Sequence, residues 1–396
     1  MKILFFFIGL FVVLVLAYGL STNRKNIKYR HVAQLIMIEI LLAFFLFHTD
    51  IGVLIINQIT GFFDALLSYA ATGSNFVFGN LVNKGQFSFF LGVLMPIVLV
   101  SALIGILQYI RLLPLVIKSV GWLLSKINGM GRIESFNAVS SLILGQSENF
   151  IAYKNILSQI SDKRMYTMAA TAMSTVSLAI VGSYMQLIPP KYVVAALVLN
   201  MLSTFIILLI INPYDPEKET QFEIMENTSQ KKQTFFEMLS EYILDGFKVA
   251  VIVAAMLIGF IALIDLLNDL CRHILHISFQ GILGYIFYPV AWLLDIHGAE
   301  TLPAASIMAT KIVSNEFVAM TWLKQTMQHF STHTVGVISV FLVSFANFGS
   351  IGIIVGAVHG LNRKQANLVA RHGFKILLNA TMVSFLSALI TSLVLF

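Results

Sequence analysis

Cysteine and charged residues are scarce in this chain. Of its 396 residues 11% are charged, and Cys271 is the one cysteine, so an intramolecular disulfide is excluded. The sequence also lacks a P-loop, a nucleophile elbow and an HExxH motif, which are the usual parts of an ATP-driven pump or a hydrolase. We therefore expect neither an enzyme nor a cofactor.

A metal centre is not expected either. Cys271, His273 and His276, or His329 with His333, have spacings that a metal could use, but neither group offers a full set of ligands. The net charge of +6 could indicate nucleic acid, yet the basic residues alternate with apolar segments instead of clustering on one of them. Neither a metal nor a nucleic acid is thus a predicted partner.

Hydrophobic residues make up 58% of the chain, more than a soluble core can bury. Residues 3–20 and 87–110 carry no charge, and about 20 apolar residues suffice to cross a bilayer. The first run is too long for a signal peptide, and basic residues follow it directly. The sequence therefore predicts a multi-pass protein surrounded by lipid.

The expected fold is an all-α polytopic membrane protein. Four stretches are apolar but interrupted by Gly, Pro or charges, which predicts interfacial or re-entrant helices at 51–69, 112–127, 137–158 and 279–323. Eight uninterrupted apolar segments predict transmembrane spans at 3–20, 32–48, 87–110, 165–188, 191–211, 243–267, 335–358 and 374–396.

Basic residues fix the orientation of these spans. The loop between the first two holds Arg24, Lys25, Lys28 and Arg30, which should stay in the cytoplasm. The N-terminus is then periplasmic, and eight crossings return the C-terminus to the same side. Of the two re-entrant hairpins that the interrupted stretches predict, the first (within 137–158) would open to the cytoplasm and the second (within 279–323) to the outside.

Two halves of the chain show weak similarity to each other, because Glu148 and Glu316 stand in related short motifs within broken apolar stretches. This pattern is typical of a transporter built from inverted repeats. The predicted division is an N-terminal scaffold (1–110), a first transport repeat (111–211), a polar cytoplasmic linker (212–240), a sixth scaffold span (241–270) and a second transport repeat (271–396).

The first broken hairpin carries polar residues within SSLILGQSENF, residues 140–150. Gly145 and the polar residues Gln146, Ser147 and Glu148 interrupt a stretch too short to cross twice. Freed backbone is tolerated in a membrane only where it lines a cavity, and an intramembrane carboxylate commonly marks an ion or substrate path. The alternative is that Glu148 is a loop carboxylate among lipid headgroups.

The second broken hairpin, SIMATKIVSNEFVA at 306–319, contains Lys311 and Glu316. These two could form an ion pair, or Glu316 could accept a substrate hydroxyl. Asn347 and small polar residues interrupt a later span, and Ser174 and Thr175 do so in the first half. A carboxylate and an amide would complement a sugar, whereas small polar residues also serve plain helix packing.

Five segments resemble signatures of the concentrative nucleoside transporter family: GQSENF, SIMATKIVSNEFVA, SVFLVSFANF, FQGILGYIFYP and EYILDGFKVA. The resemblance covers essentially the whole chain and is closest to bacterial proton-driven nucleoside permeases. It implies a homotrimer in the inner membrane, in which a fixed scaffold holds an elevator-like transport domain. Pyrimidine nucleosides, and purine nucleosides in addition, are the implied substrates.

The resemblance also implies roles for particular residues. The residues facing the base would be Gln146, Ser147, Glu148 and, on the apolar side, Ile180. The residues facing the ribose would be Glu316, Asn347 and Ser350, with Phe345 nearby. The sequence departs from the family pattern at Gly349, where close relatives usually have Ser.

Ser141 bears on the coupling ion. Sodium-driven members of the family have Asn at this position, and the other ion contacts would come from Leu144, Thr175 and Val176. Because a hard cation needs several oxygens, a vestigial cation site is the better interpretation. Transport is then expected to be coupled to protons. Glu148 is the expected proton carrier, because an apolar cleft favours the neutral form of a carboxyl group.

The predicted function is therefore nucleoside:proton symport. The alternatives are a sodium-coupled nucleoside carrier and, from another class, a passive channel or a receptor. A dicarboxylate transporter would also use paired hairpins, but its anion site should avoid Glu148 and Glu316.

Overall fold

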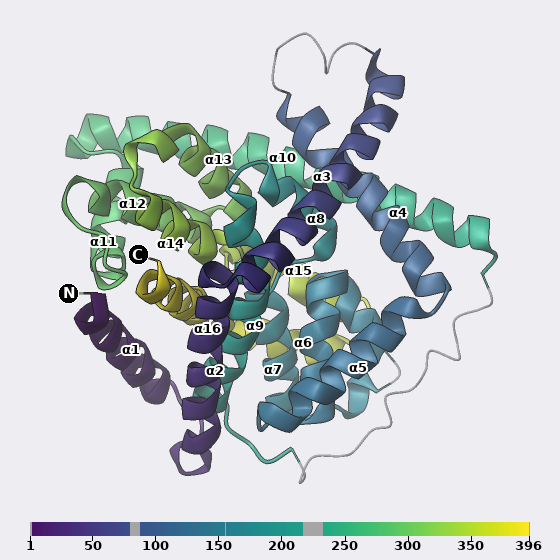
Figure 1. Cartoon of the computed structure of the whole chain (residues 1–396), viewed down its shortest axis with the longest axis horizontal. Helices are drawn as coiled ribbons and strands as arrows, with labels where there is room; N and C mark the ends of the chain where they lie inside the picture. The colour runs from purple at the N-terminus through teal and green to yellow at the C-terminus, as the bar shows by residue number, and fades with distance from the viewer. Residues whose placement is uncertain (1, 80–87, 155, 217–232, 396) are drawn as a thin grey trace.

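The computed structural model describes residues 2–79, 88–154, 156–216 and 233–395, and within them the regular structure is helical with no strand (Figure 1). The main helices are α1 (Lys2–Gly19), α2 (Tyr29–His48), α3 (Asp50–Phe78), α4 (Pro96–Tyr109), α5 (Leu112–Ile127), α6 (Arg132–Leu144), α7 (Asp162–Ser174), α8 (Leu178–Met185), α9 (Pro190–Ile211), α10 (Phe235–Leu275), α11 (Phe279–Leu293), α12 (Thr301–Val313), α13 (Glu316–Thr326), α14 (Thr332–Leu342), α15 (Phe348–His359) and α16 (Arg363–Val394).

Eight helical stretches of the described chain are long and apolar enough to cross a membrane. Seven of them overlap predicted spans. The eighth is α3, a single 29-residue helix that runs through the stretch predicted as interfacial or re-entrant at 51–69. Its continuity excludes a re-entrant turn there and agrees with the interfacial alternative. The predicted span at 335–358 is instead two short helices, α14 and α15, with a break between them.

The order of elements in the two transport halves is the same. Each half has a broken hairpin, then a broken helix, then a continuous helix. In the first half these are α6 with the 3-10 segment η4 (Glu148–Tyr153), α7 with α8, and α9. In the second they are α12 with α13, α14 with α15, and α16. An inverted-repeat transporter requires this duplication.

The interior of the molecule is built around α9 and α16, which contact each other and both pack against α7 and α14, so that helices of both halves meet there (Figure 1). Nearly every residue of α9 is buried, and so is every residue of α7 from Arg164 onward. Helix α9 is apolar on nearly all sides, as expected of a helix in such a core. The two repeats are therefore packed as one body around shared helices.

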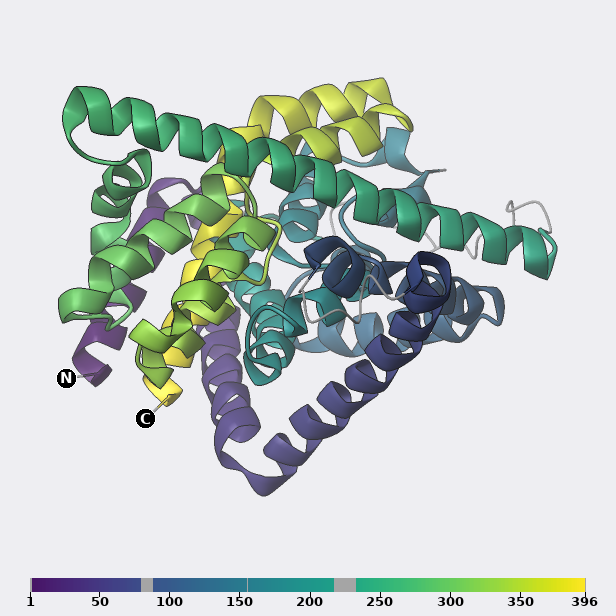
Figure 2. The same ribbon diagram turned by 90° about the horizontal axis from the view of Figure 1, so that it is seen from above.

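Helix α10 lies on the periphery and runs across the molecule (Figure 2). Its 41 residues correspond to about 61 Å at 1.5 Å per residue, about twice the apolar thickness of a bilayer. The buried residues form one stripe at spacings of four, seven or eight, Met238, Gly246, Ala250, Leu257, Ile264 and Asn268. The other faces expose large apolar side chains such as Leu244 and Ile258. Most of the predicted linker, 217–232, lies outside the described residues.

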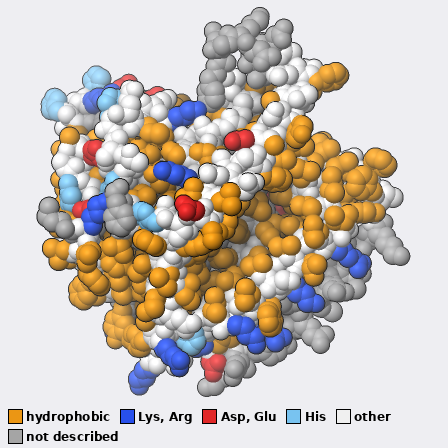
Figure 3. Space-filling model, viewed as in Figure 1, with side chains coloured by type: hydrophobic (Ala, Val, Ile, Leu, Met, Phe, Trp, Pro, Cys, Tyr) orange, Lys and Arg blue, Asp and Glu red, His pale blue; other side chains and the backbone are white. Residues whose placement is uncertain are grey.

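The two chain ends lie on the same side of the molecule (Figure 2). The ammonium group of Lys2 donates a hydrogen bond of 2.5 Å to the carbonyl of Leu395. Lys and Arg side chains gather along the lower edge in Figure 3, where Figure 1 places α5 and the loop between α1 and α2. An even number of crossings likewise places both ends on one side of a membrane.

Candidate functional site

The second hairpin turns between α12 and α13. Asn315 caps α13, and its side-chain oxygen accepts a hydrogen bond of 3.0 Å from the backbone N–H of Val318. This cap makes Glu316 the first residue of the helix. A carboxylate there is favoured by the positive end of the helix dipole.

The carboxylate of Glu316 is 4% exposed and holds two donors from different parts of the chain. The hydroxyl of Tyr184 donates to Oε1 at 2.8 Å, and Nδ2 of Asn347 donates to Oε2 at 3.0 Å. Asn347 also caps α15, because its Oδ1 accepts from the N–H of Ser350 at 2.8 Å. The structure thus brings together Glu316, Asn347 and Ser350, three of the residues expected at the ribose.

Lys311 lies on the same hairpin but has other partners. Its ammonium group donates to the carbonyl of Phe341 and to the hydroxyls of Ser344 and Ser384. Within the described part of the chain no ion pair joins Lys311 to Glu316. The alternative of a direct ion pair between Lys311 and Glu316 is therefore wrong.

The first hairpin turns at Gly145, where the backbone φ of +107° favours glycine. A Cβ at this position would lie 3.1 Å from both Oε2 of Glu148 and Cβ of Ser177. The hydroxyl of Ser147 donates to Oε2 of Glu148 at 3.0 Å, and the Glu148 side chain is exposed. Gln146 is buried, and its Oε1 has no partner among the described residues.

The two helix breaks meet each other. The backbone N–H of Phe345, in the break between α14 and α15, donates to the carbonyl of Thr175 at 3.2 Å. Thr175 stands in the break between α7 and α8, and Ile180 is buried on the helix that follows. The hydroxyl of Ser177 reaches the carbonyl of Leu144 at 3.3 Å. A chain of contacts therefore connects both hairpin tips through both breaks.

The predicted cation ligands offer few free oxygens. The carbonyls of Leu144 and Thr175 already accept protein hydrogen bonds, and the Thr175 hydroxyl donates to the carbonyl of Thr171. Ser141 contributes one buried hydroxyl that has no partner among the described residues. This set contains no carboxylate.

Sequence reasoning missed Tyr184, which lies 132 residues from its carboxylate partner. Its ring also contacts Phe317, with the ring centroids 5.0 Å apart. The available signal was a tyrosine within an apolar helix, because a buried tyrosine hydroxyl usually finds a partner. No feature of the sequence around Tyr184 identifies Glu316 as that partner.

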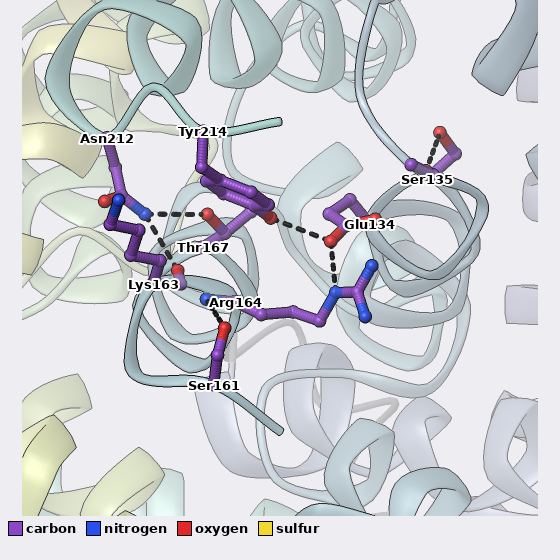
Figure 4. A network of polar contacts seen from close by, with 9 residues as sticks. Glu134, Ser135, Ser161, Lys163, Arg164, Thr167, Asn212 and Tyr214 are labelled. Carbon is purple, nitrogen blue, oxygen red and sulfur yellow. Dashed lines mark hydrogen bonds and ion pairs between the residues drawn. The ribbon is translucent and has the colours of Figure 1, made fainter. Parts of the chain in front are cut away.

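A buried polar network supports the base of the first hairpin (Figure 4). Nε of Arg164, in the first turn of α7, lies 2.6 Å from Oε1 of Glu134 in α6. The hydroxyl of Tyr214 donates to the same oxygen at 2.7 Å. The side chain of Arg164 is 2% exposed. The pair fixes the start of the hairpin helix against α7.

Glu39 had no assigned role. It is fully buried on α2, and the hydroxyl of Ser203 on α9 donates to its Oε1 at 2.6 Å. A single neutral hydroxyl is a modest partner for a buried carboxylate. The contact joins the N-terminal scaffold to the interior helix α9.

Three family models cover almost the entire chain. They are described as the N-terminus of Na+ dependent nucleoside transporters (8–81), nucleoside recognition (90–191) and the C-terminus of Na+ dependent nucleoside transporters (192–392). The purine nucleoside transport protein NupG of Bacillus subtilis is 33% identical over 98% of both chains. The chain belongs to the concentrative nucleoside transporter family.

Other relatives agree with this assignment. The nucleoside permease NupC of Helicobacter pylori is 27% identical, over 98% of this chain and 97% of that protein. The solved structure of CNTnw in an inward-facing substrate-bound state has a TM-score of 0.93 at 27% identity, over 100% of this chain and 99% of that one. A double variant of CNTnw in an outward-facing state, with the same coverage and identity, gives 0.94. The present protein is thus a multi-pass nucleoside transporter and not an enzyme.

Proposed function

We propose that this transporter takes up nucleosides by nucleoside:proton symport, with Glu148 as the proton carrier. The observation that carries the proposal is the contrast between the two hairpin carboxylates. Glu316 is buried and holds side-chain donors from two distant parts of the chain, Tyr184 and Asn347, whereas the side-chain donor to Glu148 is the hydroxyl of its neighbour Ser147. A carboxylate with few donors can gain and lose a proton at small cost in protein hydrogen bonds.

The energetics of such coupling are adequate. One charge moving through about 100 mV releases about 2.3 kcal/mol. That free energy supports accumulation of the nucleoside by about fiftyfold before any pH gradient is added. One proton for each nucleoside is therefore sufficient.

The test uses the purified transporter in proteoliposomes with imposed pH or sodium gradients. We expect uptake of labelled nucleoside to follow the proton gradient, to collapse with an uncoupler and to be indifferent to sodium. In Glu148→Gln, exchange of internal for external nucleoside should lose its dependence on pH, while Glu148→Asp should keep it. Uptake that rises with sodium and ignores the uncoupler would sink the proton assignment.

Sodium coupling is the second candidate, because two of the matching family models carry sodium in their description. The oxygens around Ser141 argue against it, since two of the carbonyls are already engaged. A passive channel or receptor is the candidate from another class. It predicts that sealed vesicles never concentrate the nucleoside beyond equilibrium.

The substrate range follows from the relatives and the site. The relative NupG is named for purine nucleosides, so we propose that purine as well as pyrimidine nucleosides are carried. The residues expected at the base are Gln146, Ser147, Glu148 and Ile180, and those at the ribose are Glu316, Asn347, Ser350 and Phe345. Competition between inosine, adenosine, uridine and cytidine in proteoliposomes ranks the bases directly.

The proposed cycle moves the two hairpins together as an elevator within a fixed scaffold. Support comes from CNTnw, a similar protein whose solved structures include inward-facing, outward-facing and intermediate states. The exposed apolar faces of α3 and α10 are suited to lipid or to neighbouring subunits of a homotrimer. Native mass spectrometry in detergent tests the trimer, and impermeant thiol labelling of added terminal cysteines tests periplasmic termini in the bacterial inner membrane.

A further inference from the structure

The ammonium group of Lys311 lies in a fully buried pocket of oxygens. It donates to the carbonyl of Phe341 at 2.7 Å, to the hydroxyl of Ser344 at 2.6 Å and to the hydroxyl of Ser384 at 3.0 Å. An ammonium group has three N–H donors, and each therefore has one acceptor. The ring of Phe341 also faces the group, with Nζ 4.8 Å from its centroid.

All three acceptors are neutral. Within the described residues no carboxylate lies at ion-pair distance from Lys311. A charge buried without a counter-ion is costly unless dipoles replace its hydration shell. One carbonyl, two hydroxyls and an aromatic face supply those dipoles here, and oxygens of this kind also bind free monovalent cations.

The pocket is built at the C-terminal end of a half-helix. Helix α14 ends at Leu342, so the carbonyl of Phe341 has lost its partner within the helix. The negative end of a helix dipole favours a cation at this place. Asn200 donates to the next free carbonyl, that of Val343, so the interrupted backbone is held from two sides.

We propose that the ammonium group of Lys311 is a tethered cation filling a monovalent-cation site, formed by the Phe341 carbonyl and the hydroxyls of Ser344 and Ser384. Removal of the side chain leaves a site for a free monovalent cation of similar size, with ammonium as the best fit. The same break leads directly to Asn347, which holds Glu316. Occupancy of this site therefore sets the geometry of the substrate residues, whichever ion drives transport.

The experiment compares Lys311→Ala with Lys311→Met in detergent. Alanine leaves the pocket open, whereas methionine fills it without a charge. The matched control is Lys191→Ala, which removes an exposed lysine that lies over the ring of Tyr192. Melting temperature and nucleoside affinity by calorimetry are measured in ammonium, sodium, potassium or choline chloride at equal ionic strength. Neither readout depends on proton coupling.

We expect Lys311→Ala in choline to bind nucleoside about tenfold more weakly than the wild type, the usual cost of losing a hydrogen bond to a charged group. Ammonium should restore the affinity and raise the melting temperature in a saturable way. The methionine variant should bind weakly in every salt. Adding Ser384→Ala to Lys311→Ala should weaken the ammonium rescue by about tenfold, because one of the three oxygens is lost.

Three outcomes would overturn the proposal. The first is a Lys311→Ala protein with the same affinity and melting temperature in all four salts. The second is an equal ammonium response in the wild type or in Lys191→Ala. The third is failure to recover folded Lys311→Ala in any salt while Lys311→Met folds, because a free cation should then have filled the open site.

Discussion

The replacement Glu316→Gln separates the structural role of this carboxylate from its expected role in binding. Glutamine has the same shape, and its Oε1 can still accept from Asn347, which donates to the carboxylate at 3.0 Å. Its Nε2 would then face the hydroxyl of Tyr184, which can accept as well as donate. Both contacts survive as neutral hydrogen bonds, so the stability cost is about 1 kcal/mol for each.

A larger effect is expected on the ribose. If a sugar hydroxyl donates to the Glu316 carboxylate, the amide loses the charged part of that bond, about 1.5 to 3 kcal/mol. Nucleoside affinity should then fall by about tenfold to 150-fold. Calorimetry with uridine, 2′-deoxyuridine and 3′-deoxyuridine locates the contact. The deoxy analogue that lacks the contacted hydroxyl should bind wild type and variant with nearly equal affinity.

The control is Glu300→Gln. Glu300 is a partly exposed carboxylate that accepts from the backbone N–H and the hydroxyl of Ser331, at 2.8 and 3.0 Å. Its replacement should leave the affinity for all three nucleosides unchanged. The reasoning is refuted if Glu316→Gln weakens uridine and both deoxy analogues by the same factor, because the carboxylate would then contact neither hydroxyl.

Two further replacements test the buried polar contacts. Arg164→Met should lower the free energy of unfolding by about 3 to 5 kcal/mol, because it leaves Glu134 charged and buried, and adding Glu134→Gln should recover most of that loss. Thermal melting in detergent measures both, and an equal loss in the double variant would contradict the pairing. Ser203→Ala should cost about 1 to 3 kcal/mol by removing the donor to Glu39, whereas a neutral result in the same assay would show that another donor reaches the carboxylate.

The hairpin breaks could be predicted because their signals are local. Gly145 follows the last residue of α6 with a positive φ, and both Asn315 and Asn347 act as helix caps. Each is a residue type that favours a helix end over a helix interior. A polar or glycine residue within an apolar stretch therefore located both hairpins and both broken helices.

The same signals do not break helix α3. Gly61 and Asp64 interrupt its apolar sequence, and an interfacial or re-entrant segment was expected there, but the helix continues through both without a turn. No atom lies within 4 Å of where a Cβ of Gly61 would stand, so this glycine serves no close approach. One glycine costs a helix about 1 kcal/mol, which the remaining 28 residues easily offset.

Partners distant in sequence could not be predicted either. Lys311 and Glu316 are five residues apart, and a local argument pairs them. In the structure each finds partners more than 25 residues away, Lys311 at Phe341 and Glu316 at Tyr184. The packing of the two repeats decides which groups meet.

The two hairpin carboxylates show how a duplicated fold can acquire two tasks. Both follow a break at the tip of a hairpin, yet Glu316 is held by Tyr184 and Asn347, whereas Glu148 has the hydroxyl of Ser147 and is exposed. Donors on both oxygens stabilise the charged form of a carboxylate, and a charged acceptor binds a ribose hydroxyl more strongly than a neutral one. A lightly held carboxylate suits a group that must change its protonation in every cycle. Differences in the surroundings of two acids can assign different roles to them.

Removal of a donor to Glu316 should therefore make its protonation matter. In Tyr184→Phe, nucleoside affinity is expected to become dependent on the protonation of Glu316. A pH profile of binding identical to that of the wild type would contradict this assignment.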